Sequence, residues 1–392
     1  MNYDFDSPID RSGTHAVKYA LRRTKFGRDD VLPLWVADMD FAAPDCVRAA
    51  LAARAAHPIY GYTITPREAL EAIAAWQRAR HGWVVEPDWI LVGPGLLPLL
   101  AVSIEALSRS GDAVAVPTPV YNPLFDVPSR LGRRVLRLPL LWDGSGHRFD
   151  FDVIAHALTP DTRLLLLCSP HNPGGRVWRR QELTQLSELC LRHDLIVVSD
   201  EIHADLVYPG HRHVPFASLA PELAARTVTL NSPGKTFNIA GLNTAYAIVP
   251  DRALRERLHA AVQAHCFEGP NLMGLTAMMA AYREGEPWLA ALMDYLAGNL
   301  ELALTTLAAR SPDVVCPRPE STYLLWLDCR RLGWSDRELH ARLIGTGLGL
   351  TPGSQFGPEG SGCMRLNFAL PRSRLQQALE LLEAALAAPS KP

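Results

Sequence analysis

Short apolar runs alternate with amphipathic stretches through the middle of the chain. Strands are predicted where such a run is short and rich in Val, Leu or Ile, at 89–93, 113–117, 134–138, 163–168, 195–199, 227–230 and 244–249. Helices are predicted over 97–109 and 180–193, the second because Leu183, Leu186, Leu189 and Cys190 share one helical face. Strands that alternate with helices predict an α/β fold, with a mostly parallel sheet covered by helices on both faces.

The two ends of the chain follow a different pattern. One long helix is predicted over 287–310, followed by strands over 321–328 and 363–368 and a closing helix over 373–387. The first forty or so residues show no clear periodicity, and we expect them to pack on this smaller C-terminal unit. Because 392 residues are many for one core, we expect two domains: a large domain, 46–286, and a small α+β domain, 287–392, on which the N-terminal segment, 1–45, packs.

Composition narrows the possible partners and the compartment. The chain is 48% apolar and 20% charged with a net charge of −2, which argues against disorder and against a nucleic-acid-binding surface and favours a small-molecule partner. The polar start predicts no secretory signal, and no apolar run has the length of a membrane span. Seven scattered cysteines without a C-x-x-C pair indicate buried, reduced thiols, a cytoplasmic protein and no metal site.

Three polar motifs each follow a predicted strand. They are Ser-Pro-His-Asn-Pro-Gly-Gly at 169–175, Ser-Asp-Glu-Ile-His at 199–203 and Ser-Pro-Gly-Lys at 232–235. Taken singly, the first two motifs are compatible with ordinary turns or loops, and a lone lysine after a turn is usually solvated. However, ligands of open α/β sheets bind at the carboxyl ends of strands, where all three motifs are expected.

In combination, these motifs resemble those of the fold type I enzymes that use pyridoxal 5′-phosphate (PLP). The matching segments are 169–178, 199–205 and 232–242. With Trp-Val-Ala-Asp-Met-Asp-Phe at 35–41, the chain most resembles the MalY/PatB-type cystathionine β-lyases, over about residues 10–374. The resemblance implies a PLP cofactor bound by the large domain, a seven-stranded sheet and a homodimer with shared active sites.

The resemblance also implies cofactor contacts at the matching positions. Lys235 would hold PLP as a Schiff base, Asp200 would keep the pyridine nitrogen protonated, and Asn172 would donate to the phenolic oxygen. His203 would be a further cofactor-binding residue. Tyr121 would stack on the ring, although a tyrosine that merely packs in the core fits the sequence equally well. The phosphate would contact three backbone amides, one hydroxyl and a tyrosine of the other subunit, namely Gly95, Leu96, Leu97, Ser232 and Tyr62.

Substrate contacts are implied for three further residues. Arg365 would bind the substrate carboxylate; the alternative is an edge-strand arginine facing water, but a charged residue among apolar neighbours needs a partner. Ala37 and Tyr323 would line the pocket, and for Tyr323 simple packing in a strand is an equal alternative.

Two departures from the wider superfamily bear on the reaction. Many aminotransferases carry a phosphate-binding arginine eight residues after the lysine, where this chain has Asn243, and a serine before the lysine, where it has Gly234. The lyase branch also lacks that arginine. The predicted activity is therefore carbon–sulfur β-elimination, which releases a thiol, pyruvate and ammonia from cystathionine or a related cysteine S-conjugate. The alternatives are an aminotransferase with the same lysine and, ranked last because the key residues are present, an inactive descendant that serves as a binding module.

Overall fold

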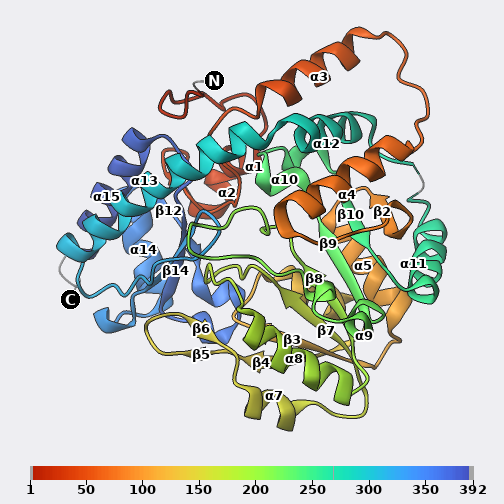
Figure 1. Cartoon of the computed structure of the whole chain (residues 1–392). Coiled ribbons are helices and arrows are strands. Elements are labelled where there is room, and N and C mark those ends of the chain that lie inside the picture. The colour runs from red at the N-terminus through yellow and green to blue at the C-terminus, as the bar shows by residue number, and fades with distance from the viewer. Residues whose placement is uncertain (1–2, 268, 388–392) are drawn as a thin grey trace.

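A seven-stranded sheet lies at the centre of this computed structural model, which describes residues 3–267 and 269–387 (Figure 1). The spatial order is β2-β10-β9-β8-β7-β3-β4, and β10 runs antiparallel to the other six strands. All seven predicted strands are confirmed, with ends that differ by at most one residue. They are β2 (Ile90–Gly93), β3 (Ala113–Thr118), β4 (Arg134–Pro139), β7 (Thr162–Cys168), β8 (Ile196–Asp200), β9 (Thr227–Asn231) and β10 (Ala245–Ile248).

Helices cover both faces of this sheet because its central strands are apolar on both sides. Along β3, Val114 and Val116 enter one core, and Ala115 between them enters another, as the two-residue period of a strand requires. The first core lies under α5 (Leu96–Leu107), α6 (Pro123–Arg130) and α11 (Arg252–Ala264). The opposite face is covered by α4 (Arg67–His81), α7 (Phe151–Ala157), α8 (Arg180–Arg192) and α12 (Leu272–Glu284).

The strand register brings the three predicted motifs to one edge of the sheet. Cys168 at the end of β7 pairs with Asp200 at the end of β8, which in turn pairs with Leu230 near the end of β9. The residues that follow these strands therefore begin side by side. The short α10 (Pro233–Thr236), which contains Lys235, starts directly after β9.

A second, three-stranded sheet forms in the C-terminal part of the chain. Its order is β11 (Leu324–Asp328), β14 (Cys363–Asn367) and β13 (Thr351–Pro352). The helices here are α13 (Glu286–Arg310), α14 (Asp336–Thr346) and α15 (Arg372–Ala387). The predicted long helix and closing helix are confirmed, whereas the strand predicted from 321 begins only at Leu324, because Ser321 bridges to Val207 instead.

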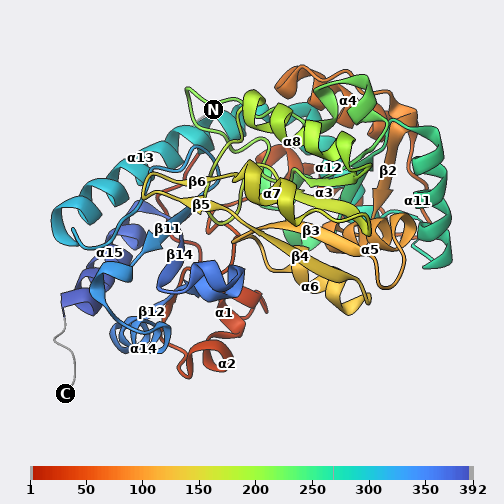
Figure 2. The same cartoon turned by 90° about the horizontal axis from the view of Figure 1, so that it is seen from below.

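The N-terminal segment packs on this C-terminal part, as expected. Its β1 (Leu32–Pro33) pairs in parallel with β12 (Leu348–Gly349). The short α1 (Val17–Ala20) leads into α2 (Arg22–Phe26), which lies beside α14 (Figure 2), where the Phe26 and His340 ring centroids are 6.1 Å apart. The segment is followed by α3 (Asp45–Ala56), which packs against α12. Neither α3 nor α4 was expected from the periodicity. Two further short strands, β5 (Leu141–Trp142) and β6 (His147–Arg148), and the short helix α9 (Pro221–Ala224) complete the strands and α-helices of the described residues.

The division into 1–45, 46–286 and 287–392 remains a proposal. The separate small sheet supports it, although one apolar core includes residues from all three parts, such as Phe41, Trp76 and Leu366. Residues 1–2 and 388–392 of these ranges lie outside the described part of the chain.

The cysteine prediction needs a correction. All seven thiols are unpaired, as expected, but only four are buried; Cys46 and Cys316 are half-buried and Cys266 is exposed. Among the helices of the described residues, none combines the length and the apolar character needed to cross a membrane.

Candidate active site

A cavity of about 570 Å³ opens at the carboxyl edge of the large sheet. Of the thirteen residues predicted for the site, eleven line it: Ala37, Gly95, Leu96, Leu97, Tyr121, Asn172, Asp200, His203, Ser232, Lys235 and Arg365. Tyr323 lies behind the wall, where its buried hydroxyl donates to the Ala37 carbonyl at 2.9 Å. Tyr62 is fully exposed on the loop between α3 and α4, outside the cavity lining.

Lys235 extends into the cavity from α10. The Ser232 hydroxyl caps this short helix by accepting the Gly234 N–H at 3.0 Å. The Lys235 Nζ donates to the Ala37 carbonyl at 2.5 Å. Loss of solvent, and then the nearby Arg365 charge, lower the pKa of Lys235 to about 8. A substantial fraction of the amine is therefore neutral near pH 8, which is the form able to attack a carbonyl carbon or accept a proton.

Asp200 is a buried carboxylate at the end of β8 with spare acceptor capacity. It accepts the Ile202 N–H at 3.2 Å, and no ion pair found among the described residues includes it. Burial raises its pKa to about 6. Because a buried carboxylate is costly without a cationic or donor partner, this residue fits a protonated ring nitrogen of a ligand.

Arg365 is a buried cation without a carboxylate partner in the described structure. It lies on the central strand β14, which rules out the water-facing edge position considered above. Its guanidinium donates to Asn172 Oδ1 at 3.0 Å and to the Trp35 carbonyl at 2.7 Å, and its Nε is buried without a partner. Burial lowers the pKa of Arg365 to about 10, which still leaves it charged at neutral pH. A free carboxylate in the cavity would satisfy this charge.

The start of α5 also lines the cavity and has the features of an anion site. Gly95 precedes the helix with φ 141° and ψ 164°, a conformation that is essentially restricted to glycine. The N–H groups of the first helical turn have no partners within the helix, and their dipoles favour a bound phosphate. Ser232 lies nearby, but its hydroxyl donates to the Thr244 carbonyl at 2.7 Å, so a phosphate would have to replace that acceptor.

Two further predicted residues, Tyr121 and His203, line the same cavity as these charged groups. The half-buried Tyr121 donates its N–H to the Asn172 carbonyl at 3.0 Å, and burial raises the pKa of its hydroxyl. His203 is buried beside Tyr323, and burial lowers its pKa to about 3, so its ring is neutral.

Several cavity residues were missed in the sequence. Thr351, Gln355 and Phe356 belong to no motif; Thr351 and Phe356 reach the site only because β13 and the turn after it flank Arg365, whose guanidinium lies 4.9 Å from the Phe356 ring. Cys168 could have been found, since it ends β7 directly before the 169–175 motif and its Sγ accepts the Asn172 N–H.

Comparison with known proteins agrees with this geometry. The aminotransferase class I and II family model matches residues 29–382. The chain is 42% identical to cystathionine β-lyase PatB of Bacillus subtilis, covering 98% of this chain and 100% of PatB, and 34% identical to protein MalY of Escherichia coli, covering 96% and 97%. Cystalysin from Treponema denticola, whose crystal structure contains a pyridoxal 5′-phosphate cofactor, superposes with a TM-score of 0.95 at 32% identity, covering 98% of this chain and 99% of cystalysin. A lysine, an acid and an anion site at one sheet edge, in a chain matched over nearly its whole length, place this protein in the class I and II aminotransferase family.

Proposed function

We propose that this protein is a PLP-dependent carbon–sulfur β-lyase that cleaves cystathionine or related cysteine S-conjugates. The observation that carries the proposal is the convergence of Lys235, Asp200 and Arg365 on one cavity. The 42% identity to a cystathionine β-lyase over the full chain supports the choice of reaction. The seven unpaired thiols support a reducing compartment, and we propose the cytoplasm.

The residues present fit PLP at each of its functional groups. The amine of Lys235 would bind its aldehyde carbon, the unpaired Asp200 carboxylate its ring nitrogen, and the α5 N-terminus with Gly95 its phosphate. Asn172 would reach the phenolic oxygen, Tyr121 would cover the ring, and His203 would complete the pocket. When bound, PLP supplies an electron sink that stabilises negative charge on the substrate's α-carbon.

The chain's own residues then orient the substrate and move one proton. Arg365 binds the substrate carboxylate and so fixes the α-carbon relative to Lys235. The Lys235 Nζ accepts the α-proton, and the thiolate leaves from the adjacent carbon. With one water consumed, cystathionine gives homocysteine, pyruvate and ammonia.

An aminotransferase would share all of these residues as far as proton removal. It would then have to transfer the proton to the cofactor, and it would need a keto acid as second substrate to complete its cycle. Asn243 lines the cavity at the position where many aminotransferases have an arginine, and this difference favours the lyase.

The proposed function is tested with a panel of cysteine S-conjugates that includes cystathionine. We expect pyruvate to form from at least one member without any added keto acid, and the ranking of the panel would identify the preferred thiol. A panel that gives no pyruvate under these conditions would contradict the proposal.

Arg365→Gln is expected to weaken substrate binding, and so to lower kcat/KM, while the cofactor stays bound. Loss of a buried, hydrogen-bonded charge partner costs about 2–5 kcal/mol, so kcat/KM should fall by roughly 30- to 5,000-fold, mostly through KM. Steady-state kinetics, with the visible absorbance as a check on cofactor content, measure this effect. Unchanged KM in a cofactor-loaded variant would remove Arg365 from substrate binding.

We further propose a homodimer in which Tyr62 of each subunit completes the phosphate site of the other. The loop after α3 exposes several large apolar side chains in the single chain, with Ile59 at 67%, Tyr60 at 58% and Ile64 at 79%, which is unusual for a surface without a partner.

Mixed dimers of Tyr62→Phe and Lys235→Ala chains test this arrangement. One of their two sites would combine an intact Tyr62 with an intact Lys235, so the mixture should regain activity that Lys235→Ala dimers lack and retain cofactor better than Tyr62→Phe dimers. An active monomer would rule the shared site out.

A further inference from the structure

The 35–41 segment, from Trp35 to Phe41, crosses the cavity wall without regular secondary structure. Side chains from distant parts of the chain satisfy its backbone instead. Six of its carbonyl oxygens accept side-chain hydrogen bonds; the donors are Arg365, Thr351, Asn367, Lys235, Tyr323, Lys18 and Asn238. The position of each carbonyl therefore depends on the side chains that hold it.

The Ala37 carbonyl is the point at which this segment contacts the predicted catalytic lysine. It accepts the Lys235 Nζ at 2.5 Å and the Tyr323 hydroxyl at 2.9 Å. Because the segment carries this acceptor, a shift of its backbone would leave the Lys235 amine without its partner.

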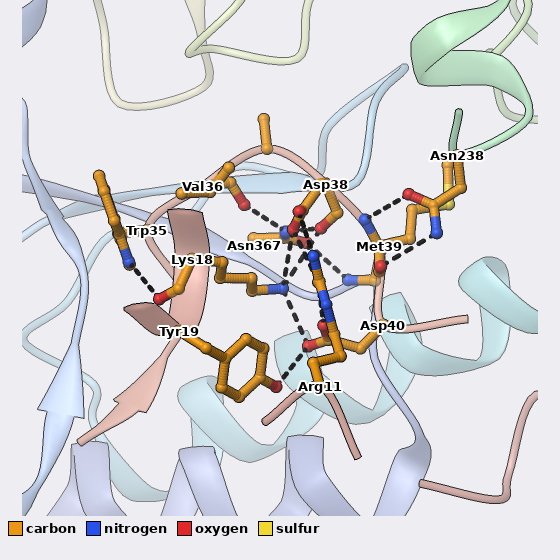
Figure 3. Close-up of polar contacts among 12 residues, drawn as sticks. Arg11, Lys18, Tyr19, Trp35, Val36, Asp38, Met39, Asp40, Asn238 and Asn367 are labelled. Atoms are coloured by element: carbon orange, nitrogen blue, oxygen red, sulfur yellow. Dashed lines mark hydrogen bonds and ion pairs between the residues drawn. The ribbon is translucent and has the colours of Figure 1, made fainter. Parts of the chain in front are cut away.

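A cluster of four charged side chains, Arg11, Lys18, Asp38 and Asp40, anchors the segment at its two aspartates, as Figure 3 shows. Lys18 is fully buried, and its Nζ donates to Asp40 Oδ2 at 2.9 Å and to the Asp38 carbonyl at 3.3 Å. Arg11 contacts both carboxylates, at 2.7 Å from Asp38 and 2.6 Å from Asp40. The Tyr19 hydroxyl adds a contact to Asp40 at 3.3 Å.

This cluster is unusual in its composition and its burial. The chain contains only four lysines among its 39 lysines and arginines, and one of the four is fully buried at position 18. Two positive and two negative groups balance within the cluster. Apolar residues usually stabilise a core at least as well as a buried ion pair does, so net stability does not explain this cluster. We interpret the pair instead as a device that specifies one arrangement of the chain.

We propose that Lys18 and Asp40 are positioning residues for Lys235. Their buried pair fixes the backbone of the 35–41 segment at Asp38 and Asp40, and the segment in turn sets the Ala37 carbonyl that holds the free Lys235 amine. This inference rests on the proposed function, in which Lys235 carries the cofactor and accepts the substrate proton. The Trp35 carbonyl, which contacts Arg365, has an independent anchor in Thr351 at 2.9 Å.

The kinetic test uses Lys18→Met, Asp40→Asn and the double variant in the cofactor-loaded enzyme. Because a small misplacement of a catalytic group is costly, kcat should fall by roughly 10- to 100-fold, while KM stays within about threefold because Arg365 keeps its anchor. The double variant should be no slower than the slower single variant, since both break the same pair. Arg23→Gln, which removes the exposed Arg23–Asp29 pair of the same N-terminal segment, is the matched control and should leave kcat unchanged.

A second measurement works without turnover. In the cofactor-free protein, a small amine-acylating reagent is followed by peptide mapping, with the exposed Lys25 as internal reference. In Asp40→Asn, which keeps all four lysines, Lys235 should react severalfold faster relative to Lys25, because its amine has lost the Ala37 acceptor. Arg23→Gln should leave this ratio unchanged.

These two measurements separate the inference from the proposed function. Unchanged labelling of Lys235 in folded Asp40→Asn, or unchanged kcat in both single variants, would overturn the positioning role. Should Lys18→Met not fold, the near-isosteric Asp40→Asn carries both tests. Faster labelling of Lys235 in a protein that releases no thiol would leave the positioning role intact and reject only the lyase.

Discussion

Lys235→Ala is expected to abolish turnover. Without the amine there is neither a covalent link to the cofactor nor a base for the α-proton, so kcat should fall by about 10⁴-fold or more. Lys25→Ala, an equal truncation at an exposed lysine, is the control and should remain active. Turnover by Lys235→Ala comparable with that of the control would contradict the assignment.

The covalent link itself can be assigned by peptide mapping. Borohydride reduction of the loaded enzyme should leave a pyridoxyl group on Lys235. With only four lysines in the chain, the map is unambiguous. A label on another lysine would contradict the assignment of Lys235 as the cofactor-binding residue, whatever the activity of Lys235→Ala.

Asp200→Asn is expected to produce the second large effect. The asparagine keeps the shape but cannot stabilise a positive charge on the ring nitrogen, so kcat and the exchange of the α-hydrogen with deuterated water should each fall by about 10²- to 10³-fold. The covalent link to Lys235 should still form. Equal kcat values for Asp200→Asn and the unchanged protein would show that Asp200 has no role in the mechanism.

The same substitution separates function from stability. Burial raises the pKa of Asp200 from the usual 3.8 to about 6. The free energy of unfolding therefore falls as the pH rises from about 3.8 to about 6, because the buried carboxylate ionises less readily than in the unfolded chain. The loss of stability persists at higher pH. Cofactor-free Asp200→Asn should therefore unfold at no lower temperature than the unchanged protein at pH 8. A lower unfolding temperature would indicate a structural role for this carboxylate.

The sequence was sufficient to predict the large sheet and most of the candidate residues that line the cavity. Its strands are short apolar runs, and the register of β7, β8 and β9 carries the three motifs to one edge. By contrast, α3 is rich in alanine and buries only Val47, so it has no apolar stripe to detect.

What holds the 35–41 segment could not be predicted. Its anchors, Lys18, Asn238 and Asn367, are far apart in the chain, and a contact between a side chain and a backbone carbonyl leaves no periodicity. Likewise, Thr351 contacts Arg365 only because β13 pairs with β14. Such residues become visible once the strand pairing is known.

The most direct test of the β-lyase assignment follows the fate of cystathionine in the absence of any keto acid. A thiol reagent, a pyruvate assay and the visible spectrum of the cofactor are recorded in one reaction. We expect thiol, pyruvate and ammonia in equal amounts over many turnovers, with the absorbance of the Lys235-linked cofactor restored at the end. If no thiol appears and the cofactor accumulates in its amine form until a keto acid is supplied, the protein is an aminotransferase and the lyase assignment is wrong.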